Sequence, residues 1–262
     1  MKHVSPWIAE YNNLLRAPPA LGELKRNSGS TFGWEAKLTF AIGSAFALAP
    51  IWAIRDRGDE VESVLLPASP NEFQSSSLAW LGIDQKRIFV QTTQERYADF
   101  TPPPEVSSQD FYAGLRPIFL NHSAACTYPP KVFISRQDAG YRRVTNEEAL
   151  WKKLQKHGFH RVIAGQLTLS QQVAVFRDSE LILTPHGAAL TLLFCCRPGT
   201  RLFELMPGFE ERTCFRDLAS QFSLPYGRII CSTHQRQNKR RREADLIFPL
   251  GTTSPFFGMH EN

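Results

Sequence analysis

Residues 131–164, KVFISRQDAGYRRVTNEEALWKKLQKHGFHRVIA, decide the fold class of this chain. The apolar run at 131–135 is typical of a buried strand. Residues 145–148 (TNEE) fit the T-x-x-E capping box that begins a helix, and Gly158 stands where that helix should end. A second apolar run follows at 161–164. The segment therefore predicts two parallel strands connected by a helix.

The same alternation continues towards the C-terminus. We expect strands at 181–184, 201–206 and 227–231, and helices at 170–177, after residues 185–190 (PHGAAL) and at 211–221. Parallel strands separated by helices of roughly ten residues imply right-handed crossovers. The second half is thus predicted to be a Rossmann-like domain.

The first half is also predicted to be α/β. We expect a helix at 38–54, a strand at 63–66, a helix at 72–81 and a strand at 87–91. Residues 101–130 contain six prolines and are predicted to be a linker or an irregular crossover. The whole chain is therefore predicted to be an α/β protein of two Rossmann-like lobes, residues 1–125 and 126–262, in which the short N-terminal lobe is trimmed.

Charge is distributed unevenly along the chain. Its net charge is +5, and residues 1–130 hold 11 of the 30 Lys and Arg and 13 of the 25 Asp and Glu, so that residues 131–262 hold 19 and 12. An anionic ligand is therefore expected in the second half. The composition, 42% apolar and 21% charged, excludes a disordered chain.

Targeting and redox signals favour the cytoplasm. Five Cys without a C-x-x-C pair indicate a reducing compartment, and the first residues show no apolar core of a signal peptide. Residues 38–54 lack charge for 17 positions, which fits a buried helix ending near Pro50 or a membrane-associated segment. The basic run at 236–242 fits an exposed loop, contact with an anionic membrane surface at the inner face, or nucleic-acid binding.

Polar residues that follow the predicted strands form the candidate site, because ligands of parallel sheets bind at the carboxyl ends of the strands. Arg136, Arg142 and Arg143 follow the first strand of the second half, and His186-Gly187-Ala188 follow the third. Arginines and a small-residue turn before a helix suit phosphate oxygens, and Glu204 on the fourth strand suits ribose hydroxyls. The chemistry points to a nucleotide diphosphate, although the turn matches neither G-x-G-x-x-G nor a Walker loop.

These motifs, in this order, resemble glycosyltransferase family 61, including bacterial capsular-polysaccharide types. The family pattern is matched at Ser135, Arg136, Arg142, Asn146, Glu147, Gln172, Phe176, His186, Gly187, Ala188, Leu190, Phe194, Pro198, Gly199, Glu204 and Leu205. The resemblance implies a two-lobed GT-B-type fold and an inverting sugar transfer from a nucleotide-sugar to a glycan or polysaccharide, without a metal or a cofactor. It also implies that residues 126–262 bind the donor and residues 1–125 the acceptor.

The resemblance also suggests individual roles. The expected donor-binding residues are Arg136, Arg142, Arg143, Asn146, Gln172, His186, Gly187, Ala188 and Glu204. We expect His186 to contact the leaving diphosphate and Glu35 to act as the catalytic base. Family members often carry a His-Trp pair early in the chain, where this sequence has Gly33-Trp34, and an acidic residue where it has Gln171.

Two alternatives to an active transferase follow from the sequence. The first is a catalytically degenerate family member that binds a nucleotide or a glycan without turnover. The second is a nucleic-acid-associated protein that uses the basic run, but no aromatic residue is interleaved with that run to stack on bases, so we expect no nucleic-acid partner. The residues that would contact a membrane surface are Arg236, Lys239, Arg240, Arg241 and Arg242.

Overall fold

The computed structural model describes residues 64–66, 69–90, 108–234 and 243–251. The chain divides into two units, residues 1–123 and 124–262, and each is described by itself. The helix predicted at 38–54, the predicted base Glu35 and the basic run at 236–242 lie outside the described residues.

The N-terminal unit contains the predicted strand, helix and strand in the predicted order. Strands β1 (Val64–Leu66) and β2 (Ile88–Val90) pair in parallel, with helix α3 (Glu72–Trp80) and the short 3₁₀ helix η1 (Gln85–Arg87) between them. Asn71 begins α3 because its side chain accepts a 2.9 Å hydrogen bond from the amide of Gln74, whose side chain bonds back to the amide of Asn71. This part of the chain is α/β, as predicted.

The proline-rich segment 101–130 was predicted to be a linker or irregular crossover, and this is wrong for its central part. Helix α4 (Ser108–Asn121) runs through it and includes Pro117. Phe111, Tyr112, Leu115 and Phe119 lie along one stripe of this helix, and each is at most 4% exposed. The burial of this helical stripe outweighs the one amide hydrogen bond that Pro117 cannot donate.

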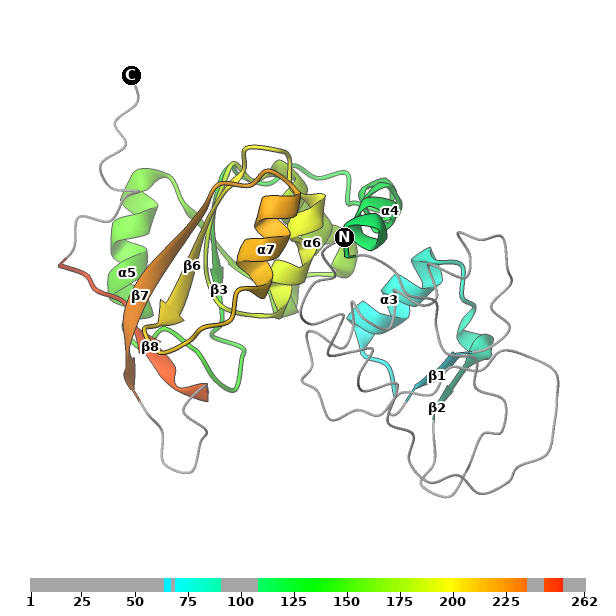
Figure 1. Cartoon of the computed structure of the whole chain (residues 1–262), viewed down its shortest axis with the longest axis horizontal. Helices are drawn as coiled ribbons and strands as arrows, with labels where there is room; N and C mark the ends of the chain where they lie inside the picture. The colour runs from blue at the N-terminus through cyan, green and yellow to red at the C-terminus, as the bar shows by residue number, and fades with distance from the viewer. Residues whose placement is uncertain (1–63, 67–68, 91–107, 235–242, 252–262) are drawn as a thin grey trace, which may run out of the picture. The chain divides into compact units, whose positions relative to one another are not determined.

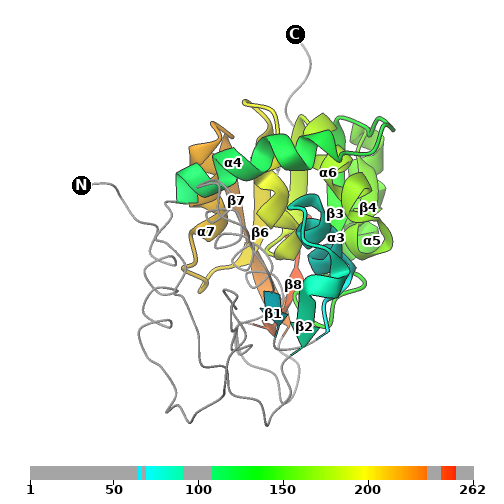
Figure 2. The ribbon, with the colours of Figure 1, turned by 90° about the vertical axis from the view of Figure 1, so that its right-hand side faces the viewer.

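The C-terminal unit is built on a six-stranded sheet with the order β4-β3-β5-β6-β7-β8 (Figure 1). The strands are β3 (Lys131–Ser135), β4 (His160–Ile163), β5 (Leu181–Pro185), β6 (Arg201–Pro207), β7 (Tyr226–His234) and β8 (Asp245–Ile247). The first five are parallel and were predicted, whereas β8 was not predicted and pairs antiparallel with β7. The labelled strands β7, β6, β3 and β4 follow one another from left to right in Figure 2.

Helices cover both faces of this sheet. They are α5 (Glu147–Leu154) with η2 (Gln155–His157), η3 (Ala164–Gln166), α6 (Leu169–Asp178), η4 (Ala188–Cys195) and α7 (Cys214–Gln221). Figure 1 shows α5 on one side of the strands and α6 and α7 on the other. Gly158 ends the first helical segment with φ 76°, the left-handed conformation that glycine adopts without steric cost.

The capping box predicted at 145–148 is wrong. Helix α5 begins after Asn146, whose side chain makes no cap hydrogen bond. The hydroxyl of Thr145 instead donates to the carbonyl of Leu246 at 3.2 Å. The reason is a tertiary one: β8 lies against residues 143–146 and uses the groups that a local cap would have used.

A true capping box begins α6 and explains Gln171, where family members often carry an acidic residue. The hydroxyl of Thr168 accepts a hydrogen bond from the amide of Gln171 at 3.3 Å, and the Gln171 side chain accepts one from the amide of Thr168 at 3.0 Å. Glutamine serves this position as well as glutamate does.

The core under α5 joins residues from the whole length of the unit. Phe133, Leu150, Leu183 and Leu246 are buried together with seven further apolar residues. The bridge between Val144 and Leu246 curls the sheet back towards its start. Among the described residues, no helix combines the length and the apolar character that a membrane span requires.

The five cysteines are all free, and we expect only one of them to react quickly. Cys126 is exposed, whereas Cys195 and Cys196 are buried. Burial raises the pKa of Cys231 to about 12, and burial followed by the charge of Glu204 raises the pKa of Cys214 to about 11. Both therefore remain protonated at pH 8, and thiolates are the reactive species.

Titration of the native chain with an aromatic disulfide at pH 8 should show one fast thiol, followed by four more after denaturation. The Cys126→Ser variant should lose the fast phase. Two or more fast thiols in the native chain, or a fast phase that persists in this variant, would contradict the burial described here.

Candidate active site

The order of the strands locates the crevice where a ligand should bind. The chain moves from β3 to β4 on one side and returns to β5 on the other side of β3. In sheets of this order, ligands bind outside the carboxyl ends of the two strands at which the direction reverses. The loops that follow β3 and β5 carry Arg136, Arg142 and His186, so three predicted donor-binding residues lie at this point.

Arg136 reaches from the end of β3 across to Gly187 after β5. A Cβ atom placed on Gly187 would lie 2.1 Å from Nη1 of Arg136, so only glycine leaves room for this guanidinium. The other terminal nitrogen donates to the carbonyl of Tyr141 at 3.4 Å, and the Tyr141 ring centre lies 5.5 Å away. The Nε atom is buried without a hydrogen-bond partner, which is rare for a buried donor.

Arg142 is held beside Arg136 and is only 7% exposed. Its backbone has φ 54°, a left-handed conformation that is uncommon for residues other than glycine. Its guanidinium donates to the carbonyl of His186 at 3.2 Å and lies 5.1 Å from the Tyr141 ring centre. Burial lowers the pKa of Arg142 to about 10, and repulsion from Arg212 and Arg136 adds to this effect.

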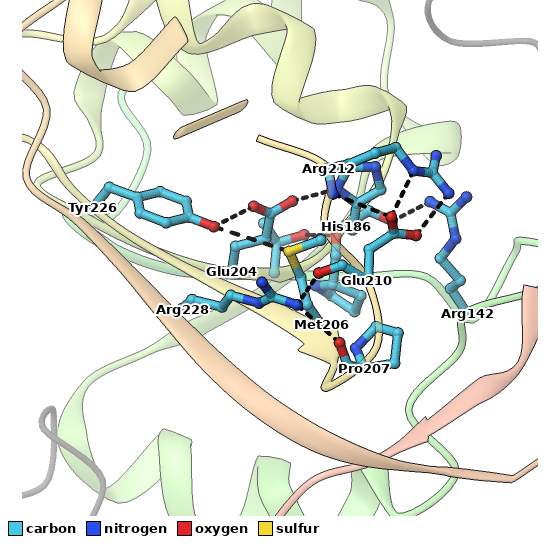
Figure 3. A network of polar contacts seen from close by, with 11 residues as sticks. Arg142, His186, Glu204, Met206, Pro207, Glu210, Arg212, Tyr226 and Arg228 are labelled. Carbon is cyan, nitrogen blue, oxygen red and sulfur yellow. Dashed lines mark hydrogen bonds and ion pairs between the residues drawn. The ribbon is translucent and has the colours of Figure 1, made fainter. Parts of the chain in front are cut away.

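His186 belongs to a buried chain of hydrogen bonds (Figure 3). Its Nδ1 lies 2.5 Å from Oε1 of Glu204, and the hydroxyl of Tyr226 donates to Oε2 of Glu204 at 2.7 Å. The Phe215 ring lies 4.9 Å from the His186 ring. Burial, followed by the charge of Glu204 and the hydrogen bond to it, raises the pKa of Tyr226. The imidazole orientation is thus set by residues of two strands, β6 and β7, and one helix, α7.

Glu204 is held in this network of hydrogen bonds, and its contact with ribose hydroxyls stays a prediction. Both carboxylate oxygens are engaged by side chains of this unit, and the residue is 1% exposed. The hydrogen bonds to His186 and Tyr226 occupy one lone pair on each oxygen. In the structure, Glu204 connects His186 with Tyr226.

Three further residues belong to the network and were not predicted from the sequence: Glu210, Arg212 and Arg228. The guanidinium of Arg212 binds both carboxylate oxygens of Glu210, at 3.0 and 2.8 Å. Figure 3 shows the guanidinium of Arg142 pointing towards the same carboxylate. Arg228 on β7 donates to the carbonyls of Pro207 (2.9 Å) and Glu210. Residues 208–213 follow β6, so the rule that located Arg136 would have found Glu210 and Arg212 if it had been applied beyond Pro207-Gly208.

A second buried carboxylate connects β3 with α5. Oε1 of Glu147 accepts hydrogen bonds from the hydroxyl of Ser135 at 2.7 Å and from the side-chain amide of Gln137 at 2.8 Å. Burial raises the pKa of Glu147, and Oε2 has no hydrogen-bond partner. Ser135 and Glu147 both belong to the predicted motif, and their contact sets the start of the loop that carries Arg136.

Two predicted donor-binding residues are held by the C-terminal strand. The amide of Arg143 donates to the carboxylate of Asp245 at 2.9 Å, and the carbonyl of Arg143 accepts from Leu246 at 2.8 Å. The side chain of Asn146 forms two 2.8 Å hydrogen bonds with the backbone of Phe248. These contacts hold residues 143 and 146, on the C-terminal side of Arg142, against the last described residues of the chain.

The other predicted residues lie around the crevice or outside the described part of the chain. Gln172 on α6 donates to the carbonyl of Leu167 at 3.1 Å, and Ala188 is exposed at the start of η4. Glu35 is not among the described residues. Within the described ranges, no group of three or more His, Cys, Asp or Glu side chains is arranged to hold a metal ion.

Comparison with known proteins identifies the family of the chain. Residues 2–203 match the model of the family described as glycosyltransferase 61, which is more than half of the chain. The chain therefore belongs to glycosyltransferase family 61. Glu204, Glu210, Arg212 and Tyr226 lie beyond the matched residues.

A curated relative also matches part of the chain. The EGF domain-specific O-linked N-acetylglucosamine transferase of Drosophila melanogaster is 31% identical over 140 residues, which cover 50% of this chain. The matched part is 24% of that protein, so the chain spans about a quarter of its relative's length.

The contact between Arg136 and Gly187 leads to a prediction. In the Gly187→Ala variant the new methyl group must displace the end of the flexible Arg136 side chain, while φ −173° is accessible to alanine. We expect the free energy of unfolding to change by less than about 1 kcal/mol. Binding of inorganic pyrophosphate should weaken about tenfold, because one charge-assisted hydrogen bond is lost.

Calorimetric titration and urea denaturation measure the two quantities. Gly140→Ala is the matched control, since nothing lies within 4 Å of its added Cβ. Equal pyrophosphate affinity in both alanine variants would show that Arg136 does not contact the anion.

Proposed function

We propose that this chain transfers a sugar from a nucleotide-sugar to a hydroxyl group of a glycan acceptor, with inversion at the sugar carbon and without a metal ion. The observation that carries the proposal is the group of guanidinium side chains, Arg136, Arg142 and Arg212, beside an oriented imidazole at the switch point of the sheet. Membership of family 61 supports the transfer of a sugar as the reaction.

The arginines would bind the diphosphate of the donor. Arg136 has a buried Nε–H without a partner, and the pKa of Arg142 is lowered first by burial and then by repulsion from its cationic neighbours. A bound phosphate group would supply the missing acceptor and offset that repulsion. The same cations would stabilise the negative charge that develops on the leaving diphosphate, which is the task a metal ion has in other transferases.

His186 would act on the leaving group. With Glu204 as a carboxylate, the proton of Nδ1 is donated to Oε1, so Nε2 donates to a diphosphate oxygen in the imidazolium form. Glu204 and Tyr226 hold the ring in place for this contact. Inversion requires the base on the opposite side of the sugar carbon, and we assign that role to Glu35 in the acceptor-binding part of a two-lobed GT-B arrangement.

The identity of the sugar and of the acceptor is part of the proposal. The printed name of the Drosophila relative makes N-acetylglucosamine the first donor sugar to test and a folded protein domain an acceptor to test beside a capsule-type polysaccharide. Location in the cytoplasm, with the basic run at 236–242 touching an anionic membrane surface, stays a prediction.

Turnover of nucleotide-sugars tests the function directly. We expect the full chain to release a nucleoside diphosphate from one member of a nucleotide-sugar panel, at a rate that an added acceptor increases. The rate should survive an excess of EDTA, because guanidinium groups and His186 supply the positive charge. Loss of turnover on chelation and its return with Mn²⁺ or Mg²⁺ would overturn the metal-independent mechanism, and donor binding without any turnover would favour the degenerate family member.

The division of roles between His186 and Glu35 has its own test. The His186→Gln/Glu204→Gln double variant avoids leaving a buried carboxylate without a partner, which is strongly destabilising. We expect it to weaken donor binding and also to lower kcat, whereas Glu35→Gln should lose transfer and keep donor affinity. Normal donor binding by the double variant, with rescue of its activity by added imidazole, would identify His186 as the base.

A further inference from the structure

Glu210 is a carboxylate placed among the cations of the proposed donor site. Its side chain is 11% exposed and forms a two-pronged ion pair with Arg212. The guanidinium of Arg142 points towards it (Figure 3). Burial alone would raise the pKa of Glu210, but the hydrogen bond and charge of Arg212, followed by the charge of His186, lower it below its usual value. The carboxylate therefore interacts with groups that we assign to the diphosphate.

The single negative charge of Glu210 does not balance the positive charges around it. Arg136, Arg142 and Arg212 carry three positive charges near one another, and Glu210 supplies one negative charge. Its attraction offsets part of the repulsion that lowers the pKa of Arg142. A diphosphate group has more charge and more acceptor oxygens than one carboxylate, so it competes well for the same guanidinium groups.

Backbone hydrogen bonds hold the loop around Glu210. The Glu210 side chain accepts hydrogen bonds from the guanidinium of Arg212 and, at 3.2 Å, from the backbone amide of Arg212. The amide of Glu210 donates to the carbonyl of Pro207 at 3.1 Å, and Arg228 donates to the carbonyls of both residues. Exchange of the carboxylate for another anion thus requires a side-chain rotation and no rearrangement of the loop.

We propose that Glu210 is a built-in anion that occupies the phosphate-binding position of the free chain and is displaced by the diphosphate of the ligand. The inference rests on the proposed function, because it takes the cluster of arginines as the diphosphate site. The carboxylate offsets part of the repulsion between the arginines and keeps them oriented in the absence of donor, and it returns when the product nucleoside diphosphate leaves. Glu210 thereby weakens the binding of donor and product and favours product release.

The test measures binding of inorganic pyrophosphate to the full chain by calorimetric titration. Removing the competing charge in Glu210→Gln should tighten pyrophosphate binding about 5- to 50-fold, the range expected for one charge-assisted interaction. The melting temperature of this variant should be lower than that of the unaltered chain without ligand and should rise more on adding pyrophosphate. Glu211→Gln is the matched control, since Glu211 is the adjacent exposed carboxylate and its variant has the same net charge.

The proposal remains testable if Glu210→Gln fails to fold. Glu210→Asp keeps the charge and withdraws the carboxylate by one methylene group, so it should bind pyrophosphate more tightly than the unaltered chain by a smaller factor. Unchanged or weaker pyrophosphate binding in a folded Glu210 variant would overturn the proposal. Weaker binding of a nucleoside diphosphate with unchanged pyrophosphate binding would also overturn it, because Glu210 would then be a contact to the nucleoside.

Failure of this inference differs from failure of the proposed function. If Arg136→Ala weakens pyrophosphate binding and Glu210→Gln leaves it unchanged, the diphosphate site stands and only the role of Glu210 is wrong. If neither pyrophosphate nor a nucleoside diphosphate binds to any of these proteins, the diphosphate site and the role of Glu210 fail together.

Discussion

The carboxylate of Glu204 is the constraint on which the candidate site depends. A charged group that is 1% exposed in an apolar sheet is costly unless each oxygen has a partner. Here the partners are His186, at the end of β5, and Tyr226, at the start of β7. One buried charge therefore fixes the imidazole relative to three neighbouring strands, and the carbonyl of His186 in turn receives the guanidinium of Arg142.

The C-terminal strand provides the second constraint. Residues 245–248 bond to residues 143–146, about a hundred positions earlier, through both backbone and side-chain groups. These bonds hold the loop in which Arg142 has a left-handed backbone and a buried guanidinium. Hydrogen bonds from a distant part of the chain thus hold the backbone on the C-terminal side of Arg142.

The fold consequently places the positively charged side chains of Arg136, Arg142 and Arg212 close enough to repel one another. Burial, joined by repulsion from neighbouring arginines, lowers the pKa of Arg142, and Arg136 keeps an unpartnered donor. Binding of an anion would stabilise such an arrangement, because the anion supplies hydrogen-bond acceptors and reduces the repulsion between the cations. In the free chain, Glu210 offsets part of the repulsion between the arginines. The proposed role of Glu210 therefore connects the stability of the free chain with its affinity for a diphosphate.

The order of strands and helices between residues 131 and 231 could be predicted from the sequence alone, as could the positions of Arg136, Arg142, His186 and Glu204 after or on those strands, because apolar periodicity and strand ends are local features. The sequence could not show that α4 runs through a proline-rich segment, that β8 replaces a helix cap at Thr145, or that Glu204 binds His186 and Tyr226. Those features depend on strand register and on contacts between residues up to about a hundred positions apart. They become visible only in the folded chain, because a buried polar group pairs with whichever group the packing brings within hydrogen-bond distance.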